Sequence, residues 1–127
     1  MTYFFDNCLS YKFANMLKAL DVDAIALRER YAENISDVDL FTALRGSGVV
    51  FITADASQTT RIQEATALRE AGITALFLGK FWSKMTFWNQ AIWTIRKWDR
   101  IEGFAANVTT GICAEIKQNG AARPFAL

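Results

Sequence analysis

The sequence lacks histidine altogether and has only two cysteines and one proline in 127 residues. Without an imidazole, the catalytic triads and general bases that depend on histidine are excluded. The cysteines, Cys8 and Cys113, lie far apart in the sequence, and a zinc site normally needs four Cys or His ligands. We interpret both as small apolar residues of a reducing compartment. Acid–base or metal chemistry in this chain therefore falls to carboxylates.

Long hydrophobic runs are missing as well. No stretch approaches the roughly 18–20 apolar residues of a membrane span, and the N-terminus shows no basic segment followed by a long apolar stretch. We therefore expect a cytoplasmic protein that does not engage a membrane. Apolar residues are nevertheless plentiful, at 52% hydrophobic and 13% aromatic. They provide the core of one domain over residues 1–127.

Charge is unevenly distributed along the chain. Residues 1–60 carry five Lys or Arg and eight Asp or Glu, a balance of −3, whereas residues 61–127 carry nine and five, a balance of +4. This uneven charge has two interpretations. It is a chance difference, or the acidic half provides a metal site and the basic half a phosphate-binding rim beside it.

Hydrophobic patterns predict strands and helices in strict alternation. Continuous apolar runs such as "VVFITAD" are typical of strands buried in a parallel sheet, and the segments between them have apolar residues at helical spacing. The alternation predicts an α/β fold, a three-layer α/β/α sandwich with a central, mainly parallel sheet. The predicted strands are residues 2–6, 22–27, 49–55, 73–79 and 109–117; the predicted helices are residues 10–20, a segment capped by Asn34 or Ser36 and stopped at Gly46, residues 59–72 and 83–104; and residues 118–127 are expected to form a loosely ordered tail.

Two of these strands end on a carboxylate. Asp6 follows "TYFF", and Asp55 ends "VVFITAD". Ligands of open α/β sheets bind at the carboxyl ends of the strands, so the two carboxylates converge if their strands are neighbours. Asp37 and Asp39 begin the helix before the second of these strands, and the loop from Tyr31 to Ser36 is long enough to bring that helix start to the same edge.

Each of these acids also has a structural explanation. Asp37 and Asp39 are ordinary first-turn residues that the helix dipole stabilises, and Asp55 can begin a turn or cap a helix. Asp6 is harder to explain in this way. Gathered in one pocket, carboxylates repel one another and raise each other's pKa, and a divalent cation relieves this repulsion. Oxygen ligands without Cys or His favour Mg²⁺ or Mn²⁺, the usual setting for phosphodiester chemistry.

Three segments carry a resemblance to a known family. In order and spacing, "FFDNCLSYKFANMLKAL", "ISDVDLFTAL" and "VVFITAD" resemble the PIN-like domains, in particular the small bacterial ones related to VapC-type toxins. The resemblance covers roughly residues 2–80. It implies a metal-dependent ribonuclease with an acidic pocket at the carboxyl edge of the sheet.

The resemblance also implies roles for individual acids. By position, Asp6 matches the first metal-binding acid of the family, and Asp39 matches the second, with Asp37 close behind it. Asp55 matches the acid after the third strand, and Thr53 matches its companion hydroxyl. The expected catalytic residues are therefore Asp6, Asp37, Asp39 and Asp55, of which Asp6, Asp39 and Asp55 hold Mg²⁺ or Mn²⁺.

The sequence departs from the family at Ser57, where relatives often carry another acid. The acidic pocket therefore has one carboxylate fewer than in those relatives. Asn7, Ser10, Thr53 and Ser57 are weaker candidates for contacts with the substrate. Ser10 is at the same time a candidate N-cap of the first helix.

The implied function is that of an endoribonuclease in which a metal activates water, and that of the toxin of a toxin–antitoxin pair. Its partners would be RNA, an antitoxin protein and a second copy of the chain. The alternative is a non-catalytic PIN-like interaction module, which the serine at position 57 favours. A phosphoacceptor receiver-like domain ranks last, because Asp6 stands alone at its strand end and no suitable lysine is evident.

All four tryptophans lie in or beside one predicted helix, within residues 81–98. Helical spacing predicts an apolar stripe of Trp88, Ile92, Ile95 and Trp98, and it directs Trp93 away from that stripe. Three interpretations stay open. The segment is a core helix, a face that binds a second copy or an antitoxin, or a surface on which nucleic-acid bases stack.

Overall fold

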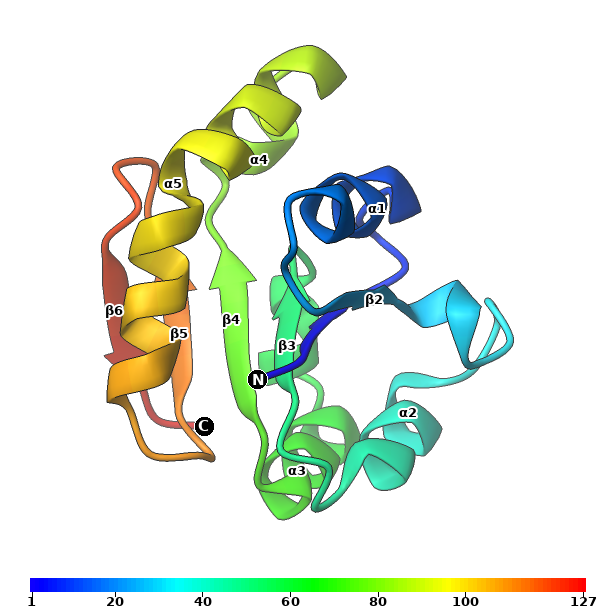
Figure 1. The fold of residues 1–127 in the computed structure, drawn as a ribbon. Coiled ribbons are helices and arrows are strands. Elements are labelled where there is room, and N and C mark those ends of the chain that lie inside the picture. Colours follow the sequence, from blue (N-terminus) through cyan, green and yellow to red (C-terminus); the bar gives the residue numbers. More distant parts are fainter.

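The computed structural model describes residues 1–127 and contains one six-stranded sheet with helices on both faces (Figure 1). The strand order is β2-β1-β3-β4-β5-β6. Neighbouring strands are parallel from β2 to β5, and β6 is antiparallel to β5. The predicted α/β sandwich with a mainly parallel sheet is confirmed. The strands are β1 (Tyr3–Phe5), β2 (Ala24–Ala26), β3 (Val50–Thr53), β4 (Thr74–Leu78), β5 (Cys113–Ile116) and β6 (Ala122–Phe125).

The helices follow the alternation that the sequence predicts. None of them is both long and apolar enough to span a membrane. Short 3₁₀ turns follow β2 and β3 and lead into the next connections. The helices are α1 (Tyr11–Ala19), α2 (Asp37–Leu44), α3 (Ile62–Ala71), α4 (Phe81–Lys84) and α5 (Phe87–Asn107), and the 3₁₀ turns are η1 (Leu27–Glu29) and η2 (Ala56–Thr59).

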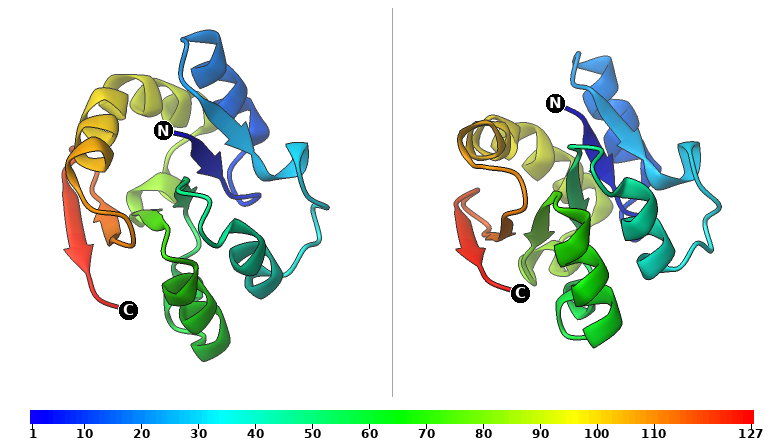
Figure 2. Two further views of the ribbon diagram at one scale, coloured as in Figure 1. Left: turned by 60° about the horizontal axis from the view of Figure 1, so that its bottom comes forward. Right: turned by 90° about the horizontal axis from the view of Figure 1, so that it is seen from below.

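The two faces of the sheet are covered by different pairs of helices (Figure 2). Side chains alternate along a strand, so Tyr3 and Phe5 of β1 pack with residues of α1 and α5. Phe4 points to the other face and packs with residues of α2 and α3. All three residues of β1 are buried. A strand covered on both faces therefore needs a continuous apolar sequence, which is what "YFF" supplies.

Side chains that accept backbone N–H groups fix the helix starts. Ser10 Oγ accepts from the backbone of Lys12 at 3.2 Å, so this residue is the N-cap of α1. Ser36 caps α2 in the same way. Thr86 Oγ1 accepts from the backbone of Asn89 at 3.2 Å and caps α5. This last cap, on extended backbone, divides the predicted helix over residues 83–104 into α4 and the longer α5.

The expectation of a loosely ordered tail over residues 118–127 is wrong. The tail forms β6 and completes a hairpin with β5. Two side chains of α5 hold the turn of this hairpin. Trp93 Nε1 donates to the carbonyl of Gln118 at 2.7 Å, and Arg100 donates to the carbonyl of Asn119 at 3.1 Å. The sequence of the tail is largely polar and does not indicate these contacts with α5, so the strand was not predicted.

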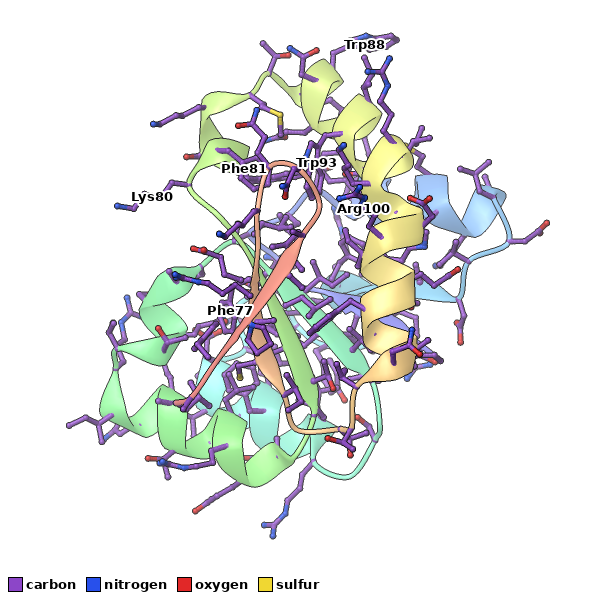
Figure 3. All side chains as sticks on the ribbon, turned by 90° about the vertical axis from the view of Figure 1, so that its left-hand side faces the viewer. Phe77, Lys80, Phe81, Trp88, Trp93 and Arg100 are labelled. Carbon is purple, nitrogen blue, oxygen red and sulfur yellow. The ribbon has the colours of Figure 1, made fainter.

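The predicted apolar stripe of α5 is also wrong in part. Trp98 is buried as the prediction requires, but Trp93, which the spacing directs away from the stripe, is buried as well. Trp88 and Ile95 are 75% and 50% exposed. The reason is the hairpin, which draws Trp93 inward, while the first turns of α5 reach past the sheet and leave Trp88 at the tip of the molecule (Figure 3).

Candidate functional site

Two neighbouring strands bring the first two predicted acids to one edge. β1 and β3 are adjacent and parallel, with Phe5 opposite Ile52. The backbone N–H of Asp6 donates to the carbonyl of Ile52 at 2.9 Å, and Asp55 follows β3 after one intervening residue. Both acids therefore lie at the carboxyl edge of the sheet, by which we mean the ends of β1, β3 and β4.

Asp6 is a buried carboxylate, 7% exposed, surrounded by donors. Its Oδ1 accepts the backbone N–H of Asn7 at 2.7 Å. Its Oδ2 accepts from the Thr53 hydroxyl at 2.7 Å and from Gln58 Nε2 at 3.1 Å. Hydrogen bonds of this number hold a buried carboxylate in one orientation.

Cys8 adds a weaker donor to the same carboxylate. Its sulfur lies 3.8 Å from Asp6 Oδ2 and 3.4 Å from the Thr53 hydroxyl. Partial desolvation of the sulfur, and then the charge of Asp6, raises the pKa of the Cys8 thiol. The raised pKa keeps the proton on the thiol at neutral pH.

Asp37, the first residue of α2, faces this edge. Its carboxyl is half-buried, and desolvation raises its pKa. The charges of Asp6, Glu64 and Asp55 raise the pKa further, while the amide of Gln58 opposes the rise. The charges of three other carboxylates thus act on Asp37, and the amide of Gln58 contacts both Asp37 and Asp6. The loop before α2 does bring the helix start to the carboxyl edge, as the sequence predicted.

Asp39 lies elsewhere. It is exposed and lines the open groove between the starts of α2 and α3, with a volume of about 870 Å³, together with Asp37, Arg61 and Glu64. Residues two positions apart on a helix point in different directions, so only one of the two acids can face Asp6. The charges of Asp6 and Asp55 act on Asp37, so Asp37 is the acid that faces them. The expected role of Asp39 as a metal ligand stays a prediction.

Asp55 is held by its own turn. Its Oδ1 accepts the backbone N–H of Ser57 at 3.0 Å and also the Ser57 hydroxyl, so it caps η2. Its backbone N–H donates to the Thr53 hydroxyl at 3.0 Å. Thr53 and Ser57 therefore position the two strand-end carboxylates. Asp55 Oδ2 accepts no hydrogen bond from the protein and stays free for a ligand.

The remaining polar candidates have local partners. Asn7 is exposed, and its side-chain amide donates to the carbonyl of Glu33 at 3.5 Å, which ties β1 to the loop before α2. Ser10 is occupied as the cap of α1. A contact of either residue with a substrate stays a prediction.

Sequence reasoning missed three residues of this site. Gln58 is completely buried in η2, and its Oε1 has no hydrogen-bond partner. Glu64 acts on Asp37 from the first turn of α3, and exposed Arg61 pairs with Glu64 at 3.1 Å. The spacing of Arg61 and Glu64 just after "ITAD" is a signal that could have found this pair. Nothing in the sequence distinguishes Gln58 from an ordinary exposed glutamine.

The donors of this site suit a hard divalent cation in kind. They are the oxygens of carboxylates, a hydroxyl and an amide. The one sulfur beside them, that of Cys8, keeps its proton and so lacks the thiolate form that binds zinc. In their present positions, however, no three acidic or cysteine side chains lie close enough together to hold a metal ion. Thr53 and Gln58 take up Asp6 Oδ2, and a cation at this edge therefore requires Gln58 to turn its amide or withdraw.

Comparison with known proteins agrees with this geometry. A family model described as a PIN-like domain matches residues 1–80. This segment runs from β1 through the loop after β4 and includes each acid of the site. No curated protein and no solved structure matches the chain.

Proposed function

The chain belongs to the PIN-like domain family, and from this premise we propose that it is a metal-dependent nuclease that hydrolyses phosphodiester bonds in RNA. One observation carries the proposal. A buried carboxylate, Asp6, lies at the carboxyl edge of a parallel sheet, and its charge acts together with those of Glu64 and Asp55 on the half-buried Asp37. Such a concentration of negative charge is costly unless a cation neutralises it, and this edge is where open α/β sheets bind ligands.

The residues that would hold Mg²⁺ or Mn²⁺ are Asp6, Asp37 and Asp55, with Glu64 as a fourth acid. When bound, the ion supplies an activated water and charge for the leaving oxygen. Thr53 keeps one oxygen of Asp6 in place by its hydrogen bond of 2.7 Å. Ser57 does the same for Asp55 and leaves its second oxygen free. Both acids are therefore preorganised before a substrate arrives.

Arg61 supplies the positive charge at the rim of this site. Its side chain is 61% exposed, and it pairs with Glu64, whose side chain is 15% exposed. Solvent at the guanidinium weakens the pair. An incoming phosphate can therefore take Arg61 from Glu64, and bidentate contacts to phosphate suit the guanidinium. The open groove beside it gives a strand access to Asp37.

The resemblance to toxin ribonucleases extends the proposal to partners. We propose that an antitoxin protein neutralises the nuclease in the cytoplasm and that a second copy of the chain can bind it. Exposed apolar residues of α5 that are available for such contacts include Phe87, Trp88 and Ile95.

A second candidate function has an observation of its own in its favour. Gln58 fills the space among the acids, and a neutral amide there satisfies Asp6 without a metal. This arrangement favours the non-catalytic interaction module, in which the acidic edge is purely structural.

Cleavage of a labelled RNA oligonucleotide with Mn²⁺ separates the two functions. Asp6→Asn, Asp37→Asn and Asp55→Asn should each lower the rate by roughly 100-fold or more, because each removes a carboxylate that would hold the ion. Asp99→Asn, an exposed acid of α5, is the matched control and should cleave like the parent chain. Asp39→Asn should retain most of the activity. Metal-independent cleavage, or none by the parent chain, would overturn the proposal.

A further inference from the structure

A second cavity lies along the same edge of the sheet, next to Asp55. It has a volume of about 350 Å³, which is within the range of small-molecule pockets. Ala54 and Ala56, the residues on either side of Asp55, line it. The cavity then continues past the end of β4 to the β5–β6 hairpin. It therefore begins where the proposed nuclease site ends.

Aromatic rings form part of the wall. Phe77 of β4 and Phe125 of β6 lie with their ring centroids 5.6 Å apart, and both line the cavity together with Trp82 of α4. Phe77 and Trp82 are buried, whereas Phe125 is partly exposed. A flat, apolar ligand can therefore lie against Phe125 without disturbing the core. Nucleobases are ligands of this shape, and they stack on aromatic side chains.

Charged side chains surround the mouth of the cavity. Lys80 follows β4, has no ion-pair partner and extends into solvent (Figure 3). Arg123 of β6 pairs with Glu115 of β5 at 3.6 Å in an exposed contact. The mouth thus carries two cations and one carboxylate. Cations bind phosphate, and a carboxylate accepts a hydrogen bond from the amino group of a base.

The cavity is shared between the segment that the PIN-like family model matches and the segment after it, which supplies five of the twelve lining residues. Trp82, Glu115, Arg123 and Phe125 all lie beyond residue 80. The β5–β6 hairpin that supplies three of them is held against α5 by Trp93. The matched segment therefore carries the acids and one wall of the pocket, and the remainder of the chain completes the pocket with Trp82 and the β5–β6 hairpin.

We propose that this cavity binds one nucleotide of a single-stranded RNA, with the base against Phe125 and the phosphates at Lys80 and Arg123, so that the adjoining phosphodiester reaches Asp55. This inference rests on the proposed function and deepens it. A single strand is the form that fits, because the bases of a duplex are stacked on one another and closed to a side pocket. The cavity would then fix the register of the strand at the acidic site.

Binding of a fluorescent single-stranded RNA, followed by anisotropy in the Asp55→Asn background with Mg²⁺, tests the inference without cleavage. Lys80→Glu and Arg123→Gln should each weaken binding about tenfold, and each should lower the slope of log K against log salt by about one. Arg45→Glu, an exposed cation at the opposite, amino edge of the sheet, is the control and should leave the affinity and the slope nearly unchanged. Equal losses in the control and in Lys80→Glu would overturn the inference.

The aromatic contact needs a variant that keeps the fold. Phe125→Leu retains an apolar side chain on β6 but removes the ring, and it should weaken binding about tenfold, as expected for loss of one stacked base. A thermal unfolding curve close to that of the parent shows that the hairpin remains. Competition by 5′-AMP at the same concentration as RNA would indicate a site for free nucleotides instead of a strand. A Phe125→Leu variant that folds and binds RNA like its parent would contradict the assignment.

The two proposals fail in different ways. If the parent chain does not cleave RNA but its RNA binding depends on Lys80, the proposed nuclease function is wrong and the nucleotide-binding cavity stands. If Lys80→Glu cleaves RNA with an unchanged KM, the chain is a nuclease, and its substrate does not bind in this cavity.

Discussion

The segment up to residue 80 and the segment after it differ in how they use charge. Residues 1–80 carry eight Lys or Arg and ten Asp or Glu, and residues 81–127 carry six and three. The acids of the first segment that face the carboxyl edge are buried or half-buried and tied to neighbours. The cations of the second segment, such as Lys84 and Arg123, are exposed. Buried charge needs a fixed environment, whereas exposed charge steers a ligand.

The same contrast holds for the aromatic residues of the second segment. Trp98 is buried and packs edge-on against Tyr3, with centroids 4.7 Å apart. Trp88, ten positions earlier on the same helix, is 75% exposed. The part of α5 around Trp98 therefore packs in the core, whereas its first turns, around Trp88, are exposed to solvent. A surface tryptophan of this kind contributes to binding and hardly at all to folding.

Truncation of these two tryptophans should give the largest difference in stability. Trp98→Ala should lower the free energy of unfolding by about 3–5 kcal/mol, because it opens a cavity between α5 and β1. Trp88→Ala should change it by no more than about 0.5 kcal/mol. Urea unfolding followed by circular dichroism measures both. Similar losses in the two variants would mean that the exposed end of α5 is covered by another part of the protein or by a second copy.

The buried acid of the first segment should show the next largest effect. Thr53→Val removes the hydroxyl donor to Asp6 and leaves a buried carboxylate short of one hydrogen bond. The expected loss is about 1–3 kcal/mol in the free energy of unfolding. Thr59→Val is the control, because the Thr59 hydroxyl donates to a carbonyl at the surface of η2. If the control costs as much as Thr53→Val, Asp6 is not the reason for the loss.

The fold was predictable wherever the pattern was local. Continuous apolar runs such as "VVFIT" can only be strands covered on both faces, and Ser10 and Ser36 mark their helices by short-range capping. The β5–β6 hairpin was not predictable, because its stability comes from Trp93 and from pairing across the sheet. Tertiary contacts of this kind leave no periodic signal in the sequence.

The candidate site was predictable to the level of the strand ends. The sequence indicates that Asp6 and Asp55 each follow a strand. The topology makes these two strands neighbours and so brings both acids to one edge. The choice between Asp37 and Asp39 depends on the rotation of α2, which a helix two turns long does not reveal. The sequence did not predict a role for Gln58. Its burial depends on the way η2 folds against the site, which has no signal in the local sequence.

Gln58 offers a direct way to sharpen the comparison of buried and exposed charge. Gln58→Glu adds a carboxylate among the four acids, so it should destabilise the chain by roughly 1 kcal/mol or more without metal. It should also increase the stabilisation by Mn²⁺, since stabilisation grows with the affinity of the folded state for the ion. A thermal shift series with increasing Mn²⁺ measures both effects.

Gln63→Glu is the matched control for this variant. It adds the same charge five positions along the chain, on an exposed side chain that lines the open groove. It should change stability and the response to Mn²⁺ only slightly, because solvent screens an exposed charge. The same Mn²⁺ response in both variants would mean that the ion binds to the acidic surface in general and not among the acids around Gln58.

Asp37 should give the smallest effect, with a sign set by its raised pKa. The folded state binds the proton of Asp37 more readily than the unfolded state does, so this carboxyl costs stability as the pH rises above its ordinary value of 3.8. Asp37→Asn should therefore be more stable than the parent at pH 7, by a few tenths of a kcal/mol after screening. The difference should disappear below about pH 3, where the parent carboxyl is protonated in both states.

Urea unfolding of Asp37→Asn between pH 3 and pH 8 checks this dependence, with Asp23→Asn, at an exposed position before β2, as the control. A gain at pH 7 together with a loss of cleavage would mean that the chain gives up stability in order to keep a carboxylate at this edge, as functional sites do. A loss of stability at pH 7 would instead place Asp37 among the structural helix-start residues, where the dipole of α2 stabilises its charge. The sign of the change in the free energy of unfolding at pH 7 thus decides whether Asp37 is a functional acid or a structural helix-start residue.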